Sequence, residues 1–332
     1  MLTESIDTVD PEIEALWGVL NPGREWRNVN LSPRFDATAA TAADMWAART
    51  GDEVDGVMAV DIVGVRRLLE LTGPVILDSG EEISAETVER DLLVDQYRRY
   101  GADNPTRRDR LGQVARAALE AINTRAVSAS ELLDAIRDLG AGRHLLMWSP
   151  HPTQQDAWTA LGTDGAVPAD ALMLSVMSRG GNKLDPYLEM NCVVTSRTDG
   201  RFRHLTVEVT TDNHVPPDLP AYVAGPYPGT DLLAGEYKGL LALTIPGAAG
   251  NITVSGDRPA AMGTDGASNL AATEIRLKPG ESLTTRFDFD ITRDQRHLVV
   301  LPSARIPATT WTHGQVSFTD ETTNRIDLET TG

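Results

Sequence analysis

Residues 28–75 read NVNLSPRFDATAATAADMWAARTGDEVDGVMAVDIVGVRRLLELTGPV, and this stretch predicts a helix, a strand and a second helix. The first helix is expected over residues 38–50, and Gly51 follows where a left-handed backbone costs glycine little. The apolar run at residues 56–60 is short and contains valines, which favours a buried strand over another helix.

The second helix is expected to begin after Asp61, whose carboxylate can cap it, and to end at Gly73 before a proline. Its buried face is predicted from side chains that recur at helical spacing: Val65, Leu68, Leu69 and Thr72. Helices that alternate with a strand through short joints are typical of an α/β layer.

Helices are expected to dominate up to about residue 180 of this chain. Further helices are predicted at residues 11–20, 84–100, 105–125, 128–140 and 152–161, with apolar strands at 143–149 and 171–177. Ser128 and Glu131 form an S-x-x-E capping box, and Gly140 is expected to close the helix that they open.

Alternating strands dominate the remainder of the chain, at residues 187–197, 201–211, 238–245, 272–277 and 282–291. Residues 198–200, Thr-Asp-Gly, join the first two strands as a hairpin turn. Regular strands separated by Gly, Pro and Asp predict a β-sandwich, for which an immunoglobulin-like arrangement is the default expectation. The sequence therefore predicts an α/β domain over residues 1–180 and an antiparallel β-sandwich domain over residues 181–332.

Composition indicates a folded protein with an acidic surface. The 332 residues are 41% hydrophobic, enough for packed cores, and carry a formal net charge of −18. This charge argues against nonspecific binding to nucleic acid, which requires a basic surface. Cys192 is the single cysteine, which excludes an internal disulfide. No apolar run reaches the about 18 residues of a membrane span, and the chain shows no signal-peptide pattern.

Three ordered blocks resemble the actinobacterial envelope proteins of the domain-of-unknown-function family DUF 4012. The first block has an NVNLTPDF-like turn, a VDGVLAIDP-like strand and a TGPV helix end, at residues 28–35, 54–61 and 72–75. The other blocks are LLMWSPHP and NKLDPYL, at residues 145–152 and 182–188. The resemblance implies an extracytoplasmic place in the cell envelope but supplies no reaction.

The order of the NVN turn, helix, DGVMAVD strand and GPV turn also looks like the LytR-CpsA-Psr phosphotransferases. This likeness implies part of a LytR-CpsA-Psr-like layer, with arginines and acidic residues around a polyprenyl pyrophosphate and its metal. It makes Arg98, Arg107 and Arg110 the candidates for phosphate binding, although Leu111 stands where that family carries a glutamine. The candidate metal ligands, Asp55 and Asp61, flank the predicted strand.

Both assignments have a structural alternative. The arginines can lie on solvated helix surfaces and pair with nearby carboxylates, namely Glu89, Asp91, Asp95 and Asp109. Asp61 can serve only as a helix cap, because aspartate is a preferred N-cap residue.

Two classes of function remain. Only residues 1–27 precede the NVN turn, whereas both families carry a longer segment there, so the chain is expected to be the C-terminal portion of a longer protein. The first class is a cell-envelope binding or structural module, with a cell-wall glycopolymer or a polyprenyl-phosphate lipid as partner. The second is a glycopolymer phosphotransferase that acts on polyprenyl pyrophosphate-linked glycans with Mg²⁺ as cofactor. We predict the first class, without a complete catalytic site, and leave the oligomeric state open.

Overall fold

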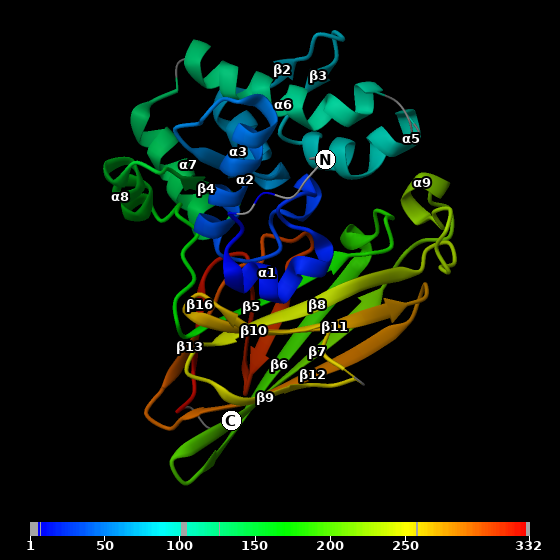
Figure 1. The fold of residues 1–332 in the computed structure, drawn as a ribbon. Helices are drawn as coiled ribbons and strands as arrows, with labels where there is room; N and C mark the ends of the chain where they lie inside the picture. The colour runs from blue at the N-terminus through cyan, green and yellow to red at the C-terminus, as the bar shows by residue number, and fades with distance from the viewer. Residues whose placement is uncertain (1–5, 7, 101–104, 126, 257, 330–332) are drawn as a thin grey trace.

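The computed structural model describes residues 6, 8–100, 105–125, 127–256 and 258–329. Most helices gather at one end of the molecule, and two large sheets lie at the other (Figure 1). The N-terminal helix α1 (Pro11–Trp17) lies against the sheets, with strand β10 (Ala261–Asp265) as its main contact. The first helix of the chain therefore contacts the sheets directly.

Helix α1 begins where the sequence predicts, because Asp10 accepts hydrogen bonds from the backbone N–H groups of Glu12 and Ile13. A 3-10 turn, Gly18–Leu20, continues it, and a second such turn spans Trp26–Asn28. The apolar side of α1 covers the outer face of one sheet in a cluster with these residues: Ile13, Leu16, Trp17, Leu20, Leu240, Ala242, Ala261, Leu270 and Ala272.

The helix, strand and helix predicted from residues 28–75 are confirmed as α2 (Phe35–Thr50), β1 (Val57–Val60) and α3 (Ile62–Thr72). Asp61 caps α3 by accepting a hydrogen bond from the backbone N–H of Gly64 at 2.9 Å. The predicted inner face of α3 is buried: Val65, Leu68, Leu69 and Thr72. These features are local, and local sequence spacing was sufficient to predict them.

Strand β1 is not buried as predicted. It pairs only with β4 (Leu145–Trp148), in an antiparallel two-stranded sheet, and Met58 on β1 is 47% exposed. A sheet of two strands leaves surface uncovered that a larger sheet would bury. The N-terminal half is therefore mainly helical, and the expected α/β layer is limited to small two-stranded sheets.

The remaining elements of this half follow α3, and several of those up to residue 121 contribute buried side chains to a second apolar core beside it. They are β2 (Val75–Ile76), β3 (Glu82–Ile83), α4 (Val88–Arg90), a π-helical turn (Asp91–Asp95), α5 (Gln96–Tyr100), α6 (Pro105–Thr124), α7 (Ala129–Ala141) and α8 (Pro152–Leu161). Ser128 and Glu131 form the predicted capping box of α7.

Gly140 does not close α7, contrary to prediction, because it lies within the helix and Gly142 is the C-cap. A Cβ atom at Gly140 would stand 2.7 Å from the backbone oxygen of Gly162, at the end of α8. This glycine therefore permits the close approach of the two helix ends.

Two six-stranded sheets form the second half of the chain. Their orders are β10-β11-β8-β5-β13-β16 and β15-β14-β6-β7-β12-β9. The strands not yet given are β5 (Ala171–Ser178), β6 (Leu188–Asp199), β7 (Phe202–Asn213), β8 (Tyr237–Pro246), β9 (Gly250–Val254), β11 (Ser268–Leu277), β12 (Ser282–Thr292), β13 (His297–Val300), β14 (Thr310–His313), β15 (Val316–Thr319) and β16 (Asn324–Asp327). A short helix, α9 (Ala221–Ala224), connects β7 to β8.

One apolar core lies between the two sheets, which makes them a β-sandwich. The predicted hairpin is confirmed as β6 and β7, and the alternating side chains Leu205, Val207 and Val209 all point into this core. Most strand pairs are antiparallel, but β13–β5 and β14–β6 are parallel, so both sheets are mixed. The immunoglobulin-like arrangement stays a prediction.

Strand β5 pairs with β8 and β13 inside the first sheet, so the sandwich begins at residue 171. The predicted division into residues 1–180 and 181–332 would separate β5 from the sheet to which it belongs. An apolar run predicts a strand, but only its long-range pairing decides the sheet that it enters.

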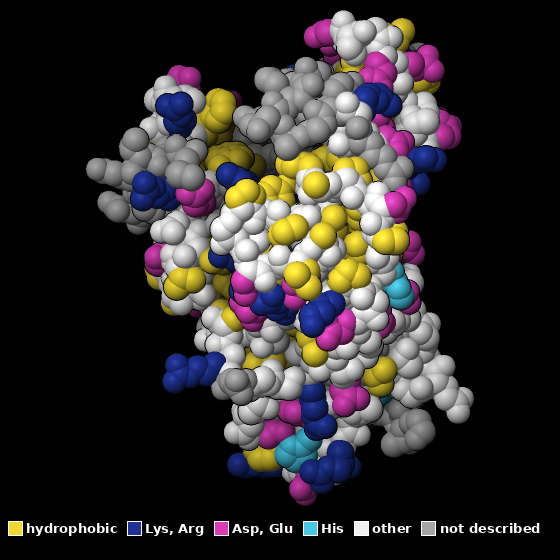
Figure 2. All heavy atoms as spheres, turned by 90° about the vertical axis from the view of Figure 1, so that its right-hand side faces the viewer, with side chains coloured by type: hydrophobic (Ala, Val, Ile, Leu, Met, Phe, Trp, Pro, Cys, Tyr) yellow, Lys and Arg dark blue, Asp and Glu magenta, His cyan; other side chains and the backbone are white. Residues whose placement is uncertain are grey.

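No helix in the described part of the chain is long and apolar enough to cross a membrane. The face shown in Figure 2 carries acidic and basic side chains interspersed around a group of hydrophobic ones. The net negative charge of the chain therefore does not give this face a single sign.

We expect Gly51→Ala to lower the free energy of unfolding by about 1–2 kcal/mol, because a side chain at a left-handed position is strained. Gly51 has a φ of +84° and open space around its missing Cβ, so backbone strain is the only local cost. Gly250→Ala is the matched control, since that position is also open but lacks a positive φ. Urea unfolding measures both variants, and equal stabilities would contradict the assignment.

Candidate functional site

A cavity of about 540 Å³ lies between the helical half and the sandwich. The turn at residues 28–35 forms one wall, and Ala59 of β1 and Leu146 of β4 form another. The sandwich contributes β5 and the loop that carries Ser303, Ala304 and Arg305. Ligand sites commonly occupy such junctions, and this one brings together segments far apart in the sequence.

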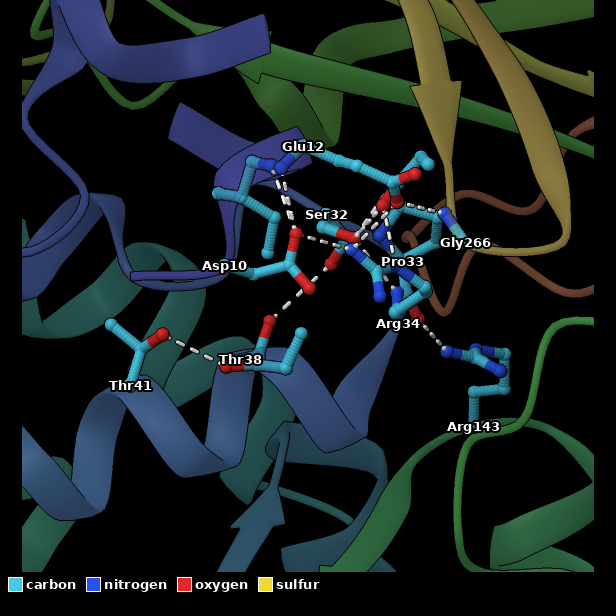
Figure 3. Close-up of polar contacts among 12 residues, drawn as sticks. Asp10, Glu12, Ser32, Pro33, Arg34, Thr38, Thr41, Arg143 and Gly266 are labelled. Atoms are coloured by element: carbon cyan, nitrogen blue, oxygen red, sulfur yellow. Dashed lines mark hydrogen bonds and ion pairs between the residues drawn. The ribbon is translucent and has the colours of Figure 1, made fainter. Parts of the chain in front are cut away.

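The turn at residues 28–35 is held in place by a buried polar cluster (Figure 3). Ser32 donates its hydroxyl proton to the Asp265 carboxylate at 2.8 Å, and the Arg34 Nε–H donates to the same carboxylate at 2.6 Å. Asp265 lies at the end of β10 and is only 1% exposed. The turn is therefore attached to the sandwich through charged hydrogen bonds.

Arg34 also forms ion pairs with Asp10 at 3.0 Å and Glu12 at 3.5 Å, on α1 and its cap. Burial disfavours the charge of the guanidinium, but hydrogen bonds with Asp10 and Asp265 hold the pKa of Arg34 above its usual value. Glu12 in turn accepts a hydrogen bond from the backbone N–H of Gly266 at 2.6 Å. We call Asp10, Glu12, Ser32, Arg34 and Asp265 the Arg34 cluster.

Arg143 lies on the opposite side of the turn, between α7 and β4, and lines the cavity. Its guanidinium donates a hydrogen bond to the backbone oxygen of Pro33 at 2.6 Å (Figure 3). It donates another to the backbone oxygen of Gly165 at 3.0 Å. In the described part of the chain it has no ion pair with a carboxylate. Burial lowers the pKa of Arg143 to about 10, against the opposing effect of Asp164.

The backbone of Arg143 has a φ of +59°, a left-handed conformation in the position that glycine usually takes after a helix. An arginine there is strained relative to glycine by about 1–2 kcal/mol. Strain of this kind is concentrated at functional sites, so the side chain is a candidate for a role in the cavity.

Arg305 lines the cavity from the sandwich side. Its guanidinium donates to the backbone oxygens of Pro307 at 2.7 Å and Leu188 at 3.0 Å, while its buried Nε has no hydrogen-bond partner. Burial lowers the pKa of Arg305, although the charge of Asp185 opposes this effect. Like Arg143, it forms no ion pair with a described carboxylate.

Positive charge exceeds negative charge in the cavity wall. Arg27 and Arg179 are exposed lining residues, and neither forms an ion pair within the described ranges. Among the described lining residues Asp185 is the one that is acidic, and its carboxylate accepts a hydrogen bond from the Tyr237 hydroxyl at 3.0 Å. In a chain of net charge −18, the described cavity wall is therefore a local excess of positive charge.

The two predicted metal ligands do not come together. Asp55 and Asp61 lie at opposite ends of β1, and the Asp55 side chain is 96% exposed. Asp61 caps α3 and also contacts Nδ1 of His144 at 2.7 Å. No group of three potential ligands was found among the residues that the structure describes, and a Mg²⁺ role for these two carboxylates stays a prediction.

Arg110 of the predicted phosphate-binding cluster is 1% exposed. Its two terminal nitrogens both lie 2.8 Å from the Glu81 carboxylate, and its Nε donates to Asp91 at 2.8 Å. The hydrogen bond with Arg110 is the main reason that the pKa of Glu81 is lowered. The side chains of Arg98 and Arg107 lie outside the described residues, so their phosphate contacts stay a prediction.

Among the described residues, the arginines that line the cavity with Asn30 are Arg27, Arg143, Arg179 and Arg305, and Arg110 is not one of them. Two of these arginines could have been found from the sequence, because they lie beside blocks that resemble the family: Arg27 directly precedes the turn, and Arg143 precedes the block at residues 145–152. No motif distinguishes Arg179 or Arg305.

Comparison with known proteins gives a family match for one part of the chain and no activity. Among curated proteins, no significant match to the chain was found. A solved structure of a candidate nutrient-binding protein from Legionella pneumophila is similar over 42% of this chain, at 9% sequence identity and a TM-score of 0.24. The similar region spans about half, 52%, of that protein, and a likeness of this degree carries no functional argument. Residues 2–97, which include the turn and helix α3, match the family described as Protein of unknown function (DUF4012).

Proposed function

We propose that this protein is a binding module whose ligand presents an anionic group to the cavity between the helical half and the sandwich. The observation that carries this proposal is that, among the described residues, the guanidinium groups of Arg143 and Arg305 donate to backbone oxygens and not to carboxylates. Both side chains are partly buried, and nearby carboxylates act on them by charge without a hydrogen bond, so a directly bound anion would stabilise the two charges. The anionic group of the ligand would be that anion.

Phosphate is the anionic group that we propose, because the planar guanidinium fork matches phosphate oxygens. Asn30 and Ser175 line the same cavity and offer neutral hydrogen-bonding groups, which suits a ligand that carries hydroxyls beside its phosphate. The proposed partners are therefore a phosphate-bearing cell-wall glycopolymer or a polyprenyl-phosphate lipid, in the extracytoplasmic cell envelope. We also propose that the N-terminal half contains part of a LytR-CpsA-Psr-like layer and that the sandwich has an immunoglobulin-like arrangement.

The alternative, a glycopolymer phosphotransferase that uses Mg²⁺, has less support. Asp55 and Asp61 are at opposite ends of β1, and electrostatic catalysis requires its groups to be held together around the reacting atoms. Glycan transfer from a polyprenyl pyrophosphate donor in the presence of Mg²⁺ would favour this alternative.

We expect Arg143→Gly to weaken the binding of inorganic pyrophosphate about 10- to 100-fold, since a hydrogen bond to a charged group contributes about 1.5–3 kcal/mol. Glycine accepts the φ of +59° at this position, so the backbone remains unstrained. Isothermal titration calorimetry measures the affinity. Arg49→Ala is the control, because it removes an equal charge from an exposed position near the end of α2, outside the cavity.

If Arg143→Gly and the wild type bind pyrophosphate with equal affinity, Arg143 does not contact the ligand. If the wild type binds neither pyrophosphate nor a short-chain polyprenyl phosphate, the proposed function is wrong. Binding of the lipid alone would identify the lipid as the better partner.

A further inference from the structure

A short loop, residues 303–309, carries Arg305 to the cavity and is held at both ends by one buried residue. Asp320 is 2% exposed and follows β15. Its carboxylate accepts hydrogen bonds from the Ser303 hydroxyl at 2.9 Å and from the backbone N–H of Thr309 at 2.6 Å. The backbone N–H of Asp320 returns a hydrogen bond to the oxygen of Thr309 at 3.0 Å.

The same loop lines two cavities. A second cavity, of about 300 Å³, shares Val176, Asp185, Ala304 and Arg305 with the first. Within the loop, Ala304 has a φ of +55°, which an alanine rarely adopts without support from its surroundings. The position of Arg305 therefore depends on contacts that hold the loop from outside.

We propose that Asp320 is a positioning residue, which places the Arg305 guanidinium for contact with the anionic ligand. This inference rests on the proposed function. Asp320 is not among the described residues that line either cavity, so it acts on the ligand through Arg305, either by holding the loop or by the charge interaction of its carboxylate with that guanidinium. Its two carboxylate oxygens bind the two loop ends, so a change there alters the geometry of the segment between them.

A double-mutant cycle tests this inference with inorganic pyrophosphate as the probe. Arg305→Ala and Asp320→Ala are each expected to weaken binding about 10-fold or more, as the loss of a charged hydrogen bond does. If Asp320 acts through Arg305, the double variant binds no more weakly than Arg305→Ala alone, since neighbours that act as one unit are not additive. Additive losses would overturn the inference.

Asp320→Asn distinguishes position from charge. The amide oxygen can still accept the Thr309 N–H, and the amide nitrogen can donate to the Ser303 hydroxyl, so we expect this variant to recover most of the affinity lost in Asp320→Ala. Affinity as low as that of Asp320→Ala would contradict a positioning role.

Circular dichroism first establishes that each variant is folded at the temperature of titration. If Asp320→Ala does not fold, Ser303→Ala replaces it in the cycle, because it removes one of the two bonds. Glu321→Gln is the control, as this neighbouring carboxylate is exposed and contacts Thr319 instead of the loop. Failure of the wild type to bind pyrophosphate would refute the proposed function and this inference together, whereas wild-type affinity in Asp320→Ala would refute only the inference.

Discussion

Arg34→Ala is expected to lower the free energy of unfolding by about 3–5 kcal/mol, the usual cost of leaving a buried partner charge uncompensated. The Asp265 carboxylate is 1% exposed and would keep only the Ser32 hydroxyl as a side-chain donor. The loss would also release α1 from the turn, because Arg34 pairs with Asp10. Urea unfolding, followed by circular dichroism, measures the change.

Arg137→Ala is the matched control for this prediction. Arg137 pairs with Asp134 at 3.8 Å, but both side chains are mostly exposed, and such pairs contribute about 0–1 kcal/mol. The double variant Arg34→Ala, Asp265→Ala should recover part of the lost stability, because it removes the unpaired charge as well. A loss in Arg34→Ala no larger than that in Arg137→Ala would show that the Arg34 cluster does not join the two halves.

Arg110→Ala is the second prediction with a large effect, again about 3–5 kcal/mol of unfolding free energy. Arg110 links three segments, since Glu81 precedes β3, Asp91 begins the π-helical turn and Arg110 itself lies in α6. Its removal would leave Asp91, a carboxylate with a 9% exposed side chain, without its closest cation.

The acid dependence of stability gives a second measurement for Arg110→Ala. The lowered pKa of Glu81 contributes stability that is present above the ordinary pKa of a glutamate and is lost as the pH falls through the lowered value. Without Arg110 this contribution should shrink, so the variant loses less stability than the wild type on acidification. If Arg110 instead contacts phosphate, as the sequence predicts, the main effect of Arg110→Ala would be weaker pyrophosphate binding at nearly unchanged stability.

Local features of the sequence were sufficient for the elements of the fold. Gly51 and Asp61 mark the end of α2 and the start of α3 because a cap depends on residues within one helical turn. The hairpin of β6 and β7 was likewise predictable, since a Gly-containing turn joins two strands that alternate with period two. Helix caps and hairpin turns are predictable because they depend on residues that are close in the sequence.

Tertiary structure decided which elements pair and pack against one another. The apolar runs of β1 and β5 look alike in sequence, yet β1 lies in an exposed pair and β5 lies inside a six-stranded sheet. Gly140 has a role only because α8 ends against it. Strand pairing and the close approach of helices depend on residues that are distant in the sequence. Hydrophobic periodicity is a local signal and does not predict such contacts.

The candidate site shows the same division. The sequence by itself determined the turn at residues 28–35, its family resemblance, and a clustered set of arginines in residues 98–110. Only the folded chain decided that Arg110 is buried against carboxylates, whereas Arg143 and Arg305 meet at one cavity with backbone oxygens as their recorded acceptors. The physical reason is that the role of a charge depends on the counter-charges and the solvent around it, and the fold brings these together from distant segments.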